Sequence, residues 1–132
     1  MVKKFAIVAV LGTLGLLWVG PSAAAVPSGP QGHWTATDRV DGSDLQLTIG
    51  GGRNPQVTLR DNGGTICGPD ASGELMAVIA RGRGVRTGDD VTVDLTVTCL
   101  SSPPTTVAVI PVTFSASSNR MMTDSTGQDW AR

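Results

Sequence analysis

The sequence has few of the side chains on which enzymes most often rely. It contains no tyrosine, one histidine, two cysteines and a single glutamate, Glu74, among 132 residues. A serine triad or a thiol–imidazole pair needs a histidine base, but His33 stands alone and no nucleophile motif frames a serine. A zinc site needs several histidine or cysteine ligands. A glycosidase needs only two carboxylates, yet a sugar-binding cleft without tyrosine would be unusual. We therefore expect no enzymatic activity, no catalytic residues and no cofactor.

Lysine occurs only at Lys3 and Lys4, at the start of a segment typical of signal peptides. These charges precede an apolar stretch, Phe5–Val19, and the small residues Ala23–Ala25 provide a cleavage site. The stretch is shorter than the roughly 20 residues that a membrane span needs. The sequence predicts that residues 1–25 are a signal peptide cleaved after Ala25 and that the protein is exported, to the periplasm or the medium, without a membrane anchor.

Basic residues are scarce once the leader is removed. Loss of Lys3 and Lys4 leaves eight arginines against eleven carboxylates, a net charge of −3. Nucleic-acid-binding proteins normally carry a basic surface, so we expect no nucleic-acid partner. The composition predicts a flexible arm over residues 26–31, rich in Pro, Gly and Ser, followed by one domain over residues 32–132. We expect this domain to be a monomer.

Cysteine is limited to Cys67 and Cys99, both in the predicted mature chain. An oxidising destination makes a structural disulfide the default interpretation. A redox-active or nucleophilic thiol is the alternative, but there is no Cys-x-x-Cys motif and His33 is distant in sequence. The sequence predicts a Cys67–Cys99 bridge.

Alternating apolar and polar residues predict a series of short strands. The clearest is 91–99, "VTVDLTVTC", which points Cys99 to the same face as four aliphatic side chains. In the strand 105–114, Pro111 lacks an N–H and predicts a sheet edge or a bulge. The other predicted strands are 34–37, 45–49, 56–60, 73–83, 120–123 and 128–131, separated by clusters of turn residues.

About eight short strands at a spacing near ten residues predict an all-β fold. We expect a small antiparallel up-and-down β-barrel, with a two-sheet β-sandwich as the alternative. Consecutive tight turns favour a meander, since a Greek key needs a longer return connection. Strands of about five or six residues favour an interior filled by side chains over one that holds a ligand.

Tryptophans stand near both ends of the predicted domain, in "GHWTATD" and "GQDWAR". The first motif resembles the Gly-x-Trp of lipocalins and related calycin barrels. This resemblance implies that Trp34, preceded by Gly32, packs at the closed end of a barrel beneath an arginine from the last strand, here Arg132. The mature chain as a whole resembles small exported bacterial β-proteins of unknown function that end in Gly-x-x-Trp-x-Arg. We expect Trp130 to be a core residue that helps to close the barrel.

Two clusters of charged residues are candidate binding sites. Asp38, Asp41 and Asp44 lie within seven residues around a glycine and could bind Ca²⁺, although their spacing is not that of an EF-hand. Asp-Gly is also a common hairpin signal, so a simple turn explains the same residues.

The second cluster contains Arg81, Arg83 and Arg86, which could bind an anion or a protein partner. A solvated hairpin whose arginines are balanced by Asp89 and Asp90 explains them equally. Neither cluster identifies a ligand.

The function favoured by these features is a secreted, non-enzymatic binding module for a small molecule or an extracellular protein. An inhibitor or interaction protein that acts on an extracellular enzyme or envelope partner, through its turns or through the arm 26–31, is the alternative.

Overall fold

A computed structural model describes residues 29–132. The predicted signal peptide and residues 26–28 of the predicted arm lie outside this range. Among the described residues, no helix is long and apolar enough to cross a membrane.

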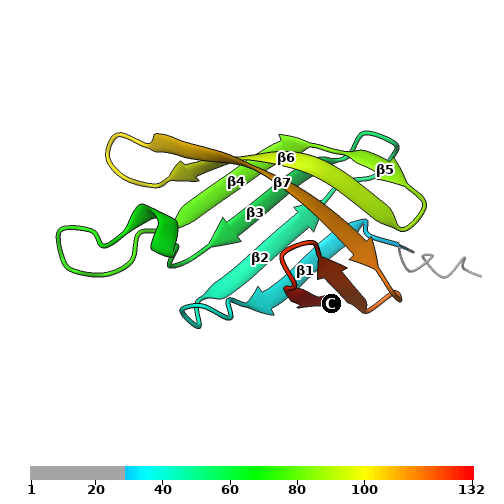
Figure 1. Cartoon of the computed structure of the whole chain (residues 1–132), viewed down its shortest axis with the longest axis horizontal. Coiled ribbons are helices and arrows are strands. Elements are labelled where there is room, and N and C mark those ends of the chain that lie inside the picture. Colours follow the sequence, from blue (N-terminus) through cyan, green and yellow to red (C-terminus); the bar gives the residue numbers. More distant parts are fainter. Residues whose placement is uncertain (1–28) are drawn as a thin grey trace, which may run out of the picture.

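The described chain folds into a closed antiparallel β-barrel (Figure 1). Eight strands follow one another around it: β1 (Gly32–Thr37), β2 (Asp44–Ile49), β3 (Gln56–Asp61), β4 (Val78–Arg83), β6 (Asp90–Cys99), β7 (Thr105–Ala116), β8 (Met121–Asp124) and β9 (Asp129–Ala131). Each strand pairs with the next, and β9 pairs with β1 to close the ring. The predicted up-and-down barrel is confirmed, and the sandwich alternative is wrong.

An extra short strand, β5 (Val85–Thr87), continues β4 after Gly84 and also pairs with β6. This strand was not predicted, because Arg86 and Thr87 belong to the turn-like cluster "RTGDD". The glycine between β4 and β5 has a packing reason: a Cβ atom at Gly84 would lie 2.7 Å from a methyl carbon of Val91.

The predicted strands match the observed ones closely, except for 73–83. There the strand begins only at Val78, and the preceding residues belong to a loop that contains the 3₁₀ turn η1 (Thr65–Cys67) and a lone bridge between Pro69 and Leu75. A run of small and apolar residues was therefore wrongly extended into a disulfide-tethered loop.

Pro111 is accommodated at an edge of β7. It lies opposite Asp94 in the β6–β7 ladder, while the bulge in this ladder falls between Val97 and Thr98. On the other side of β7, the short strand β8 pairs only with Phe114–Ala116. The edge interpretation of Pro111 is thus correct and the bulge interpretation is wrong.

Alternate side chains of the strands point inward and form one core. On β6 the buried positions are those that the sequence pattern predicts, from Val91 to Cys99. The largest fully buried side chains are Trp34, Trp130, Phe114, Leu47, Ile49 and Met122.

The residues just before β1 pack against the barrel, although the composition assigned them to a flexible arm. Pro30 is fully buried and its carbonyl accepts a hydrogen bond of 2.8 Å from the indole N–H of Trp34. The carbonyls of Gly29 and Gln31 accept hydrogen bonds from Arg132. These three residues of the predicted arm therefore contact the barrel through their backbone carbonyls.

Candidate functional site at the open end of the barrel

The two ends of the barrel differ in how they are filled. At the end where β1 begins, the Arg132 guanidinium lies over the ring of Trp34, with 4.1 Å between its Cζ atom and the ring centroid. Burial lowers the pKa of Arg132 from its ordinary value. We call this the closed end. The contact is the one that the lipocalin resemblance implied, and it is of the cation–π type.

Gly32 has a structural role at this end. Its φ of +129° suits glycine, and a Cβ atom there would lie 3.3–3.4 Å from three atoms of the Arg132 guanidinium. A Cβ atom at this position would therefore force the guanidinium to shift by a few tenths of an ångström. Gly32, Trp34 and Arg132 form one packed unit, as predicted.

Trp130 lies elsewhere. Its ring packs edge-on against Phe114, with centroids 6.2 Å apart and an angle of 70° between the rings, and its indole N–H donates to Asp124 at 2.9 Å. Trp130 is buried, as predicted, but it contributes to the wall of a cavity. Trp34 and Trp130 thus lie towards opposite ends of the barrel, with Trp130 on β9, the strand that pairs with β1 to close the ring.

This cavity has a volume of about 410 Å³ and occupies the opposite end, which we call the open end. Small-molecule sites are typically roughly 300–1,000 Å³. Its walls are mainly apolar and come from β2, β3, β4, β6, β7 and β9: Leu45, Leu59, Val78, Ala80, Leu95, Val97, Ile110, Val112, Phe114 and Trp130. The expectation of a filled barrel is wrong at this end.

Side-chain size explains the cavity. Trp34, Leu47 and Ile49 fill the closed end, and none of them lines the cavity. Towards the open end the facing residues of β4 include Val78 and Ala80, whose short side chains leave space along the barrel axis. The β8–β9 hairpin is also short, so the part of β7 around Ile110, which pairs with β6 on one side, has no β8 residue paired with it on the other side.

Charged and polar residues surround the mouth of the cavity. Asp38 and Arg39 come from the β1–β2 loop, Asp61 from the end of β3, and Asp124 from the end of β8. Arg39 forms an ion pair of 2.7 Å with Asp129, across the gap between the β1–β2 loop and the start of β9. Carboxylates therefore outnumber cations at the open end.

Three carboxylates meet beside this mouth. One oxygen from each of Asp38, Asp41 and Asp61 lies within 4.8 Å of the others. Asp44, the third member of the predicted calcium cluster, is not in this group and is exposed on β2. The sequence pattern thus identified two of the three residues, and Asp61 takes the place of Asp44.

Hydrogen bonds hold the carboxylates of Asp41 and Asp61 in place. Asp61 is 9% exposed, and its Oδ1 accepts from the Ser43 hydroxyl at 2.7 Å and from the Gly63 N–H at 2.9 Å. The Oδ1 of Asp41 accepts from the Ser43 N–H at 2.9 Å. The Oδ2 of Asp41 is buried and has no hydrogen-bond partner. Hydrogen bonding from Ser43 lowers the pKa of Asp41, so this carboxylate is ionised at neutral pH.

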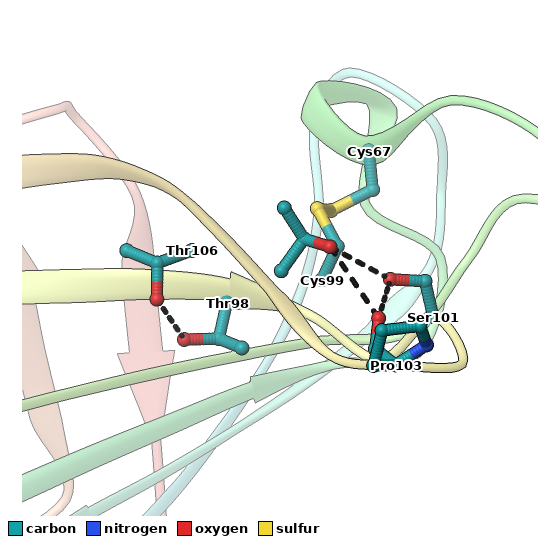
Figure 2. Close-up of a disulfide and its surroundings, with 7 residues drawn as sticks. Cys67, Thr98, Cys99, Ser101, Pro103 and Thr106 are labelled. Atoms are coloured by element: carbon teal, nitrogen blue, oxygen red, sulfur yellow. Dashed lines mark hydrogen bonds between the residues drawn. A yellow bond between two sulfur atoms is a disulfide. The ribbon is translucent and has the colours of Figure 1, made fainter.

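The disulfide fixes one wall of the mouth. Thr65 and Ile66 of η1 line the cavity, and the next residue, Cys67, is bonded to Cys99 at the end of β6 (Figure 2). The Cα atoms of the two cysteines are 5.7 Å apart. The predicted bridge is confirmed, and it holds the β3–β4 loop against the barrel.

The predicted arginine patch lies apart from the cavity. Arg81 and Arg83 are exposed on β4, whereas Arg86 on β5 donates from Nε to the carbonyl of Gly88 in its own hairpin. The histidine, His33, is exposed at the closed end, where its Nδ1 lies 3.0 Å from the Thr48 hydroxyl. Neither feature contributes to the open end.

Sequence reasoning missed Asp61 and Asp124 as site residues, although a signal was present. In an up-and-down barrel every second strand ends at the same rim. Asp38 follows β1, Asp61 ends β3 and Asp124 ends β8. Once the meander was assumed, these carboxylates could have been assigned to one end.

Comparison with known proteins adds no family: no protein-family model, curated protein or solved structure matches this chain.

Proposed function

We propose that this protein is a secreted, non-enzymatic binding module that holds a small, largely apolar molecule in the open end of its barrel. The observation that carries this proposal is the cavity of about 410 Å³, whose walls are mainly apolar and whose mouth carries a few polar groups. Concave sites with this combination are typical of small-molecule binding. Export through the predicted signal peptide fits the disulfide, because such bonds persist in oxidising compartments.

The packing of the closed end is compatible with the same function. The packed unit of Gly32, Trp34 and Arg132 closes one end of the barrel and leaves the other end hollow. In this arrangement the closed end provides stability and the open end admits the ligand. The contacts of the closed end are thus compatible with a barrel whose function lies in its interior.

Neutral apolar probes test this proposal directly. Naphthylmethanol, titrated into the mature protein by calorimetry, should bind, and Ala80→Leu should weaken binding because its larger side chain narrows the cavity. Ala80 is 4% exposed and lines the cavity, whereas Ala131→Leu adds the same atoms at an exposed position on β9 and should leave binding unchanged. Thermal unfolding of both variants checks that they fold. Equal binding by the folded Ala80→Leu variant would refute an interior site.

The alternative function, an inhibitor or interaction protein acting through the arm, can be separated from the first by a truncation. The carbonyls of Gly29, Pro30 and Gln31 are engaged by Trp34 and Arg132, so deleting them would damage the closed end. Deletion of residues 26–28 alone is the clean test. A barrel-binding protein should keep its affinity for naphthylmethanol, while an arm-dependent inhibitor should lose its activity against the extracellular enzyme.

A further inference from the structure

The cavity is apolar inside and acidic at its mouth. Ala80, Val97 and Val112 line its interior, while Asp38 and Asp61 lie at its rim. Two apolar side chains at the same rim, Val40 and Ile66, are 80% and 52% exposed. A molecule that enters this cavity therefore leaves its outer end among carboxylates and apolar side chains.

The charges at the rim are not balanced by the protein. The cation at the rim, Arg39, is bound to Asp129 at 2.7 Å. Asp124 is also engaged: its Oδ1 accepts hydrogen bonds from Thr126 and Gln128, and its Oδ2 accepts one from Trp130. Asp38 and Asp61 are left as the cavity-lining carboxylates whose charge no arginine faces at hydrogen-bond distance in the described chain.

These two carboxylates are held close to a third. Asp41 lies behind them, with one oxygen of each of the three residues within 4.8 Å. Asp61 is about nine-tenths buried, and the Oδ2 of Asp41 is buried without a partner. Like charges at this distance repel one another. A cation placed against Asp38 and Asp61 would relieve this repulsion.

We propose, building on the function proposed above, that the ligand is an amphipathic cation: an apolar body lies in the cavity, and an ammonium or similar head group is held at the mouth by Asp38 and Asp61. The head group would donate charge-assisted hydrogen bonds to these carboxylates. Asp41 supports the site by adding negative charge behind it.

The same residues suit a bare metal ion less well. Ca²⁺ takes six to eight oxygen ligands. Each of Asp38, Asp41 and Asp61 already uses Oδ1 to accept a hydrogen bond within the protein. A metal would also leave the apolar cavity beside it without a role, whereas an amphipathic cation uses both parts of the site.

The experiment compares three probes with one apolar body: naphthylmethylamine, naphthylmethanol and naphthylacetate, titrated by calorimetry at low ionic strength. The amine should bind about tenfold more tightly than the alcohol, which corresponds to one charge-assisted hydrogen bond. The acetate should bind more weakly than the alcohol. CaCl₂ is titrated separately to test the metal alternative.

A double variant identifies the residues responsible. Asp38→Asn with Asp61→Asn keeps an acceptor oxygen for the Val40 and Gly63 N–H groups, so the loops should retain their fold. The amine should lose its advantage in this variant while the affinity for the alcohol stays the same. Asp90→Asn with Asp94→Asn removes the same charge from exposed positions on β6 and should preserve the advantage.

Each other outcome is decisive. If the alcohol binds and the amine binds no better, the cation inference is overturned and the proposed barrel function stands. If the acetate binds best, or if Ca²⁺ binds to the three carboxylates and the amine shows no advantage, the inference is also overturned. If none of the three probes binds, the cavity is not a site for such molecules and both proposals fall.

Discussion

Loss of the Cys67–Cys99 bridge should remove a large part of the stability of the domain. The bridge joins residues separated by 32 positions. On the chain-entropy model, closing a loop of this length restricts the unfolded chain enough to stabilise the fold by roughly 3.5–4 kcal/mol. Domains of this size are typically stable by only about 5–15 kcal/mol. Reduction should therefore lower the unfolding temperature by roughly 15–30 °C.

The assay is urea unfolding of the mature protein, followed by circular dichroism with and without a phosphine reductant. Reduction of the unaltered chain retains both side chains, so it isolates the effect of the bond. The Cys67→Ala, Cys99→Ala variant serves as a second measurement that is insensitive to reductant. It should be slightly less stable than the reduced protein, because Cys99 is 3% exposed and its sulfur packs in the interior.

A difference in unfolding free energy below about 1 kcal/mol between the oxidised and reduced proteins would refute the reasoning. It would mean that the β3–β4 loop remains ordered around Cys67 even in the unfolded chain, or that its contacts with the barrel suffice without the bond. The slope of the unfolding free energy against urea concentration provides a check. Without the bond the unfolded chain is less constrained and exposes more surface, so this slope should be steeper for the reduced protein.

The remaining predictions concern the closed end, the barrel wall and acid stability. Arg132→Lys should lower the unfolding free energy by about 1 kcal/mol in urea titrations, since lysine lacks the planar group that covers Trp34. Gly82→Ala should lower the unfolding free energy by roughly 1–3 kcal/mol, because a Cβ atom there would collide with the backbone of β6. Gly63→Ala is the control and should lower it much less, because its Cβ atom would lie 3.5 Å from its nearest neighbours. Equal losses of unfolding free energy in the two variants would contradict this account. The pKa of Asp41 is lowered from 3.8, so its stabilising contribution is complete above that value and is lost as the pH falls through the lower folded pKa. The unfolding free energy of Asp41→Asn should therefore fall less steeply than that of the unaltered protein between roughly pH 5 and pH 2. An equal slope of unfolding free energy against pH in the two proteins would contradict this prediction.

Local sequence patterns predicted most of the strands and their inward faces. The alternation from Val91 to Cys99 reappears as the buried face of β6, because a strand with one wet side must bury every second residue. For most strands, the ends predicted from clusters of turn residues lie within one or two residues of the observed ends. The same local rules failed at residues 73–77, where the disulfide and the bridge between Pro69 and Leu75 set the path of the chain.

The hollow interior and the carboxylate group depend on relations that no short stretch contains. Whether Ala80 leaves a cavity is decided by the side chains opposite it on other strands. Asp61 joins Asp38 only because β3 and β1 end at the same rim. The packing of Pro30 under Trp34 was likewise hidden, since its composition resembles that of a linker.

The separation of the two tryptophans also determines what the intrinsic fluorescence of the protein reports. The chain has no tyrosine, and the third tryptophan, Trp18, belongs to the predicted leader. In a chain that lacks residues 1–25, near-ultraviolet emission therefore comes from Trp34 beneath a guanidinium at one end and from Trp130 in the cavity wall at the other. Replacing either one by phenylalanine leaves a single intrinsic fluorophore, so the opening of each end of the barrel can be followed separately without an attached dye.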